Sequence, residues 1–122
     1  MLYAPDKPGE AIRDVPRARR EQYRVWRGRL SQAQYDAIAD HLNERIDGAP
    51  IHTAGWMPPG EKWDDTVFEP ILSVACRGNR DAAGKCFGLI LWEVIIRREE
   101  DWSFGRFERD GVPIESMTYF RI

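Results

Sequence analysis

The chain has 122 residues, a formal net charge of −2 and a hydrophobic content of 43%, with 11% aromatic residues. This length suits one domain with a real core, and the composition excludes a chain that is disordered throughout. The longest run of apolar residues and glycine, Cys86 to Trp92, is far shorter than the roughly 20 residues of a membrane helix.

Residues 1–20 contain three prolines and one glycine with little apolar periodicity. They predict a flexible tail in front of a single compact domain at residues 21–122.

The segment from Ala11 to Leu30 holds seven arginines and two acidic residues, a local net charge of +5, so the rest of the chain carries −7. Such asymmetry is typical of proteins with a polyanionic partner, although arginines also decorate solvated segments. The seven are Arg13, Arg17, Arg19, Arg20, Arg24, Arg27 and Arg29.

Two elements are predicted next along the chain. Polar and apolar residues alternate over residues 22–26, which favours a short strand. A helix over residues 32–46 follows, because Ser31 and Gln34 have the spacing of a capping box. The apolar stripe of this helix consists of Tyr35, Ile38, Leu42 and Ile46.

The middle of the chain combines a short strand, a long loop and a second helix. Residues 50–53 can form the strand, and the loop after it holds Trp56 and Trp63, which we expect to project from the surface. Long loops in small domains are often functional. The second helix runs from residue 66 or 69 to residue 77. A start at residue 69 makes Pro70 the first helical residue, where a missing N–H costs nothing.

A third helix is predicted over residues 80–98. Its middle is apolar on nearly all sides, which places it at the centre of the domain. Gly84 and Gly88 predict a close approach of a neighbouring backbone, because glycine is otherwise unfavourable in a helix. Glu93 is the lone charge in the apolar stretch, and we favour pairing with Arg97 one turn later over a role as a site residue.

The C-terminal segment predicts a β-hairpin with strands over residues 102–109 and 112–121. Asp110 and Gly111 suit a two-residue type I′ turn between them. This turn sets a register in which aromatic, thioether and opposite-charge pairs face one another. The register predicts the pairs Arg109–Val112, Glu108–Pro113, Phe107–Ile114, Arg106–Glu115, Gly105–Ser116, Phe104–Met117, Ser103–Thr118 and Trp102–Tyr119.

Few residues are candidates for chemistry. His52 is the one plausible acid–base group, because histidine titrates near neutral pH. Cys76 and Cys86 lie in apolar helical segments that raise the pKa of a thiol, and they lack the second ligand pair that a zinc site needs. We therefore predict neither a metal nor another cofactor, and we keep a small enzyme that uses His52 as the third hypothesis.

We expect the protein to act through a macromolecular partner, with a protein as the leading interpretation and a nucleic acid as the alternative. Trp and Arg dominate protein interfaces, and arginines also contact phosphates. The residues predicted to contact the partner are Trp56, Trp63, His52, Arg17, Arg19, Arg20, Arg24 and Arg27. The start of the chain has no apolar stretch of signal-peptide length, so we expect a cytoplasmic location.

The predicted fold class is α+β. From residue 32 on, the order of helices and hairpin resembles a winged helix, a resemblance of element order without a sequence motif. It implies a DNA-binding protein whose third helix reads bases. The contacts would come from Arg80, Lys85, Arg106 and Arg109. That helix offers few side chains that suit base edges, so our leading hypothesis is a non-catalytic accessory or regulatory domain that works by binding.

Overall fold

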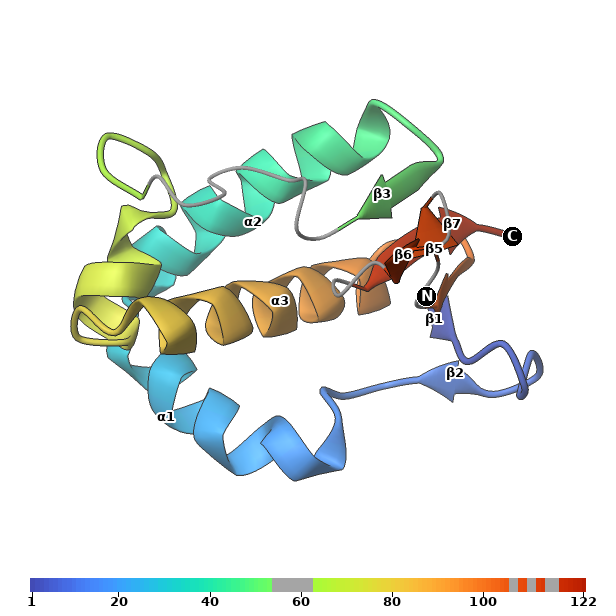
Figure 1. The fold of residues 1–122 in the computed structure, drawn as a ribbon, viewed down its shortest axis with the longest axis horizontal. Coiled ribbons are helices and arrows are strands. Elements are labelled where there is room, and N and C mark those ends of the chain that lie inside the picture. The colour runs from blue at the N-terminus through green and yellow to red at the C-terminus, as the bar shows by residue number, and fades with distance from the viewer. Residues whose placement is uncertain (54–62, 106–107, 110–111, 114–116) are drawn as a thin grey trace.

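The computed structural model combines helices with short strands, and most of the strands lie towards the two ends of the chain (Figure 1). It describes residues 1–53, 63–105, 108–109, 112–113 and 117–122. The helical elements are η1 (Arg17–Arg19), α1 (Arg20–Arg29), α2 (Gln32–Asp47), η3 (Ile71–Ala75) and α3 (Arg80–Ile96). The strands are β1 (Leu2–Tyr3), β2 (Ala11–Ile12), β3 (Ile51–Thr53), β4 (Trp102–Gly105), β5 (Glu108–Arg109), β6 (Val112–Pro113) and β7 (Thr118–Arg121). This is the α+β class that the sequence predicts.

Helix α3 is the centre of the molecule, as its composition predicts. Figure 1 shows it running between α2 on one side and α1 on the other, with the sheet at its C-terminal end. Nine of its residues are buried, and Ile90, Leu91 and Ile95 are fully inaccessible. Trp92 packs on the sheet, with ring centroids 4.8 Å from Phe104. No helix in the described part of the chain is long and apolar enough to span a membrane.

The five-stranded sheet has the order β2-β1-β4-β7-β3. Strand β1 is parallel to β4, and the other neighbours are antiparallel. Residues 1–20 are therefore not the loose tail that the sequence predicts, since Leu2 and Val15 are buried in the core. The tail prediction failed because a two-residue strand has no periodicity to detect, while a parallel partner one hundred residues away supplies its hydrogen bonds.

Helix α2 confirms the prediction for residues 32–46. The Ser31 hydroxyl accepts a hydrogen bond from the Gln34 N–H, and the Gln34 side chain accepts one from the Ser31 N–H. The second helix begins at residue 69, the later of the two predicted starts, because residues 69–70 are helical and η3 continues from them as a π-helical segment to Ala75. Its end is two residues earlier than predicted. It ends where Arg77 and Gly78 adopt positive φ values of 51° and 85°, which a continuing helix cannot accommodate.

The predicted strand at residues 22–26 is wrong, because these residues lie in α1. The alternating pattern is also compatible with a helix: Tyr23 and Trp26, three residues apart, share one face and are buried. Val25, which a half-buried strand would place beside Tyr23, is 47% exposed. The strand at residues 50–53 is confirmed as β3.

The hairpin forms with one error in its register. In β5 and β6, Arg109 pairs with Val112 and Glu108 with Pro113, as predicted. Further out, β7 is shifted by two residues, because four residues separate β6 from β7 and only two separate β4 from β5. A shift of two keeps every side chain on its face. The observed pairs are Trp102–Arg121, Ser103–Phe120, Phe104–Tyr119 and Gly105–Thr118. The predicted pairs Phe107–Ile114 and Arg106–Glu115 lie outside the described residues.

Gly84 and Gly88 do not mark a close backbone approach, and this prediction is wrong. A Cβ atom placed at either position would meet no heavy atom of the described residues within 4 Å, other than those of its chain neighbours and of the helix's own backbone. Gly84 lies on the exposed side of α3. These glycines therefore weaken the helix without a packing reason.

Candidate partner-binding surface

Helix α1 is attached to the body of the protein by three of its arginines as well as by its apolar face. The Arg20 Nε atom lies 3.0 Å from the Asp14 carboxylate, and Arg29 donates a hydrogen bond of 2.8 Å to the Ala75 carbonyl. The Arg27 guanidinium lies over the Tyr35 ring, 3.7 Å from its centroid. These contacts use arginine both as an ion-pair partner and as a flat group that stacks on an aromatic ring.

The other four arginines of this segment point to solvent. Arg13, Arg17, Arg19 and Arg24 are exposed, and within the described residues their side chains make no hydrogen bond or ion pair. We call these four the basic ridge. Val25 lies beside Arg24 and is 47% exposed, and Glu21 lies one turn before it. The ridge is therefore cationic, but exposed apolar and acidic side chains lie among its arginines.

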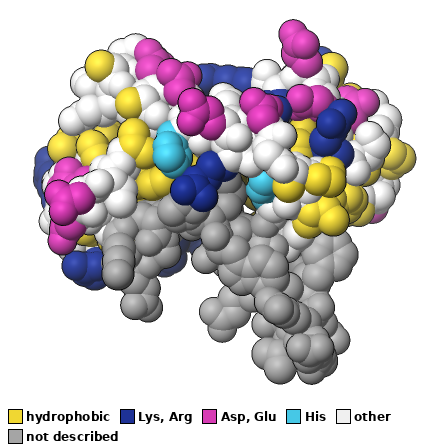
Figure 2. Space-filling view, turned by 90° about the horizontal axis from the view of Figure 1, so that it is seen from above, with side chains coloured by type: hydrophobic (Ala, Val, Ile, Leu, Met, Phe, Trp, Pro, Cys, Tyr) yellow, Lys and Arg dark blue, Asp and Glu magenta, His cyan; other side chains and the backbone are white. Residues whose placement is uncertain are grey.

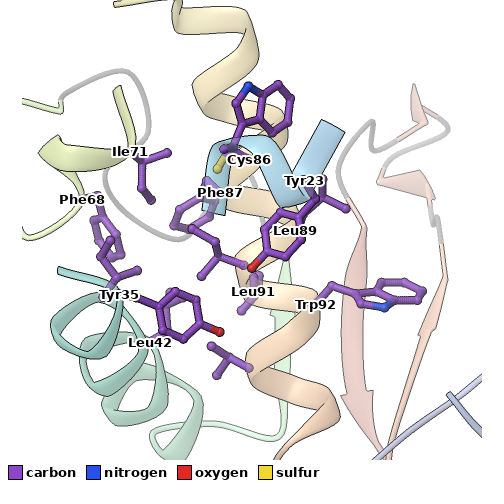
Figure 3. Close-up of a cluster of buried hydrophobic side chains, with 14 of the residues drawn as sticks. Tyr23, Tyr35, Leu42, Phe68, Ile71, Cys86, Phe87, Leu89, Leu91 and Trp92 are labelled. Carbon is purple, nitrogen blue, oxygen red and sulfur yellow. The ribbon is translucent and has the colours of Figure 1, made fainter. Parts of the chain in front are cut away.

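A polar network inside the molecule fixes α1 against α2 and α3. The Tyr23 hydroxyl donates a hydrogen bond of 3.1 Å to Glu93 Oε1, and the Tyr35 hydroxyl donates to the same atom. Figure 3 shows both tyrosines entering the core cluster, one from α1 and the other from α2. Arg97 lies 3.7 Å from Glu93 Oε1, which confirms the predicted pairing. Sequence reasoning missed the tyrosines, although the spacing of Tyr23 and Trp26 was a usable helical signal.

The same network explains the protonation of the two phenols. Burial is the main factor that raises the pKa of Tyr23 and of Tyr35, and the Glu93 carboxylate raises both further. Both phenols therefore remain protonated and can donate to the carboxylate across the whole neutral range. Because Oε1 accepts two phenol hydrogen bonds within the core, Glu93 acts as a structural acceptor that joins three helices.

The His52 ring makes hydrogen bonds within the connection between α2 and β3. Its Nε2 atom lies 3.0 Å from the Ile46 carbonyl oxygen and 2.7 Å from that of Ala49. Because carbonyl oxygens only accept, Nε2 carries the proton and donates to both. The ring also lies near Trp102, with centroids 6.0 Å apart. The structure brings no nucleophile or carboxylate to His52 within the described residues.

The loop tryptophans differ in what the structure shows. Trp63 is only 5% exposed and makes an edge-to-face contact with Phe87, with centroids 6.5 Å apart. The expectation that Trp63 projects from the surface is therefore wrong, because its ring completes the core beneath the start of η3. Trp56 lies outside the described residues.

Both cysteines are free thiols in the core. Cys86 is fully inaccessible and Cys76 is 5% exposed. Burial raises the pKa of both thiols, and each lies close enough to the other to influence it. This agrees with the expectation from their apolar surroundings and gives neither thiol the thiolate character of a nucleophile.

The residues of the winged-helix interpretation are scattered. Arg80 and Lys85 are exposed near the start of α3. Arg109 lies in β5, where only the backbone is described, and Arg106 lies outside the described residues. Most of α3 is buried between α1, α2 and the sheet, so it has no open face of the length that a recognition helix presents to a major groove.

Comparison with known protein families, with curated proteins and with solved structures finds no match to this chain.

Proposed function

We propose that this protein is a binding domain of accessory or regulatory type that docks on an anionic macromolecular partner through the basic ridge. The observation that carries the proposal is that the seven arginines fall into two groups with different surroundings. Arg20, Arg27 and Arg29 hold η1 and α1 on the body, and the four ridge arginines are exposed, with no hydrogen-bond or ion-pair partner for their side chains within the described residues. A fixed set of guanidinium groups is suited to carboxylates or phosphates on a partner.

The shape of the ridge supports a macromolecule as the partner. Arg17 and Arg24 are seven residues apart on the outer side of η1 and α1, which corresponds to roughly 10 Å along a helix. The surface is the outside of a helix, and two cavities in the described part of the chain lie elsewhere, beside Arg98 at the ends of α2 and α3. An extended convex surface suits a second surface better than a small ligand.

A protein is the preferred partner, because the ridge is not purely cationic. Val25 offers exposed apolar area next to Arg24, and Glu21 adds an opposite charge. Mixed apolar and charged side chains with arginine are typical of protein interfaces, whereas Glu21 would repel a phosphate backbone. A nucleic acid remains the alternative, since each ridge arginine can also contact a phosphate.

The proposal is tested by capture from an extract of the native host, with the immobilised protein and with the variant Arg17→Glu/Arg24→Glu. The matched control is Arg77→Glu/Arg121→Glu, which makes the same charge change at exposed positions outside the ridge. We expect a defined protein that is retained at about 50 mM salt and released at high salt. It should be lost only with the ridge variant.

Titration of labelled single- and double-stranded oligonucleotides separates the two kinds of partner. Tight, salt-sensitive and sequence-independent binding that the ridge variant loses would replace the protein partner by a nucleic acid. Equal capture by wild type, ridge variant and control variant would refute the proposal as a whole.

A further inference from the structure

Helix α2 presents an acidic counterpart to the basic ridge. Asp36, Asp40 and Glu44 are spaced by four residues and are exposed, because the apolar stripe of α2 faces inward. We call these three the acidic ridge. Asp36 accepts a hydrogen bond from Gln32, and the carboxylates of Asp40 and Glu44 have no hydrogen-bond or ion-pair partner within the described residues. Figure 2, which views the molecule from the α2 side, shows a band of acidic side chains across this face.

The two ridges lie on opposite sides of the molecule. Helix α3 runs between α1 and α2 in Figure 1, and each of these helices turns its buried side chains towards α3. Their exposed ridges therefore point away from each other and cannot meet within one chain. The arginines Arg17 and Arg24 are about two turns apart, and so are the carboxylates Asp36 and Glu44.

We propose that the basic ridge of one copy docks on the acidic ridge of a second copy. The occupant follows from charge complementarity: the four exposed guanidinium groups of the basic ridge, three of them on η1 and α1, match three carboxylates on α2. The proposal rests on the same basic ridge as the proposed function and names one partner for it. Because the two surfaces differ, the contact is head-to-tail and can propagate through further copies, unlike a two-fold dimer.

The association should be weak and strongly dependent on salt. Exposed ion pairs contribute little each, and the contact is limited to one helix from each copy. Electrostatic attraction extends over roughly 30 Å at about 10 mM salt but only over roughly 3 Å at about 1 M salt. We therefore expect an association constant that falls at least about tenfold between these conditions.

The test is sedimentation velocity of the full chain, from micromolar to submillimolar concentration, at low and at high salt. The wild type should sediment faster with increasing concentration at low salt and remain a monomer at high salt. Arg17→Glu/Arg24→Glu cancels the positive charge of the basic ridge and leaves the acidic ridge intact, and Asp40→Lys/Glu44→Lys reverses the charge of the acidic ridge and leaves the basic ridge intact. Each variant alone should remain a monomer. An equimolar mixture of the two should associate again, because each then offers the ridge that the other needs.

Controls and competing outcomes are built into the same experiment. Glu10→Lys/Glu99→Lys makes the charge change of the α2 variant at exposed positions outside the acidic ridge and should associate like the wild type. A wild type that is monomeric at every concentration and salt, or a mixture that fails to associate, would overturn the proposal. The α2 variant keeps the basic ridge, so it should still capture the external partner. Capture without self-association thus leaves the proposed function in place and removes only this inference.

Discussion

The Glu93 network makes a measurable prediction about how α1 is held. Tyr23→Phe and Tyr35→Phe each remove one hydroxyl that donates to Glu93 Oε1 and leave the rings in place. A hydrogen bond to a charged acceptor stabilises a protein by about 1.5–3 kcal/mol. The Glu93 side chain is 19% exposed, so water can replace part of what is lost. We expect each single variant to lose about 1–2 kcal/mol of unfolding free energy.

The double variant is the more informative measurement. It leaves a largely buried carboxylate with Arg97 at 3.7 Å as its one described partner, so we expect a loss of about 2–4 kcal/mol. For a chain of this length, that corresponds to a lowering of the melting temperature by roughly 6–20 °C. The shared acceptor couples the two tyrosines, and the two single losses need not add up to that of the double variant.

Thermal and urea denaturation of the four proteins provide the assay, with Tyr119→Phe as the matched control. Tyr119 is 2% exposed, and burial alone raises its pKa, with no hydrogen bond from its hydroxyl in the described residues. Its substitution should change stability little. A double variant that loses less than about 0.5 kcal/mol, or no more than Tyr119→Phe, would refute the view that this network joins the helices.

Three further predictions concern the core, the C-terminal end of α3 and its glycine. Leu91→Ala should lose about 2–5 kcal/mol in urea denaturation, since Leu91 is fully buried, and a loss below about 0.5 kcal/mol would contradict the packing. Just after α3, the hydrogen bond that Glu100 accepts from Arg98 lowers the pKa of Glu100 to about 2. The stability that this pair contributes is therefore fully present above the pKa of an unfolded glutamate, about 4.3, and it is lost as the pH falls towards 2. Glu100→Gln should therefore lose less stability than the wild type between pH 5 and 2, and equal acid profiles would argue against the pair. Gly84→Ala should raise stability by up to about 1 kcal/mol, and a destabilised variant would show that the open space beside Gly84 is needed.

The sequence predicts those elements whose signals are local. The capping box at Ser31 and Gln34 defines the start of α2, and the apolar middle of α3 places that helix in the core. The pairing of Arg109 with Val112 is the one that the Asp110–Gly111 sequence signal predicts. In each case the determining interactions connect residues that are close in the sequence, so propensity and spacing contain the information.

The failures involve contacts between distant residues. The pairing of Leu2 with Trp102 comes from a parallel strand that no local pattern indicates, and the pairing of β4 with β7 is shifted by two residues from the register that turn chemistry predicts. The candidate surface shows the same limit. Charge counting finds the arginine-rich segment, but only the fold shows that Arg27 stacks on Tyr35 while Arg24 remains exposed.

The internal network and the basic ridge are mechanically connected, which gives the binding proposals a test that leaves the charge of the ridge unchanged. On the buried side of α1, the Tyr23 hydroxyl donates a hydrogen bond to Glu93. Arg24 is the next residue in the chain and lies on the exposed side of the same helix. A ridge that is held in place before binding loses less conformational entropy when it meets a partner. Removing the Tyr23 and Tyr35 hydroxyls should therefore weaken both partner capture and self-association while every ridge arginine is retained. If the charge of the ridge alone determined binding, the folded double variant would bind as well as the wild type. Binding measured well below the melting temperature of the double variant therefore distinguishes a ridge that must be held in place from one that needs only its arginines.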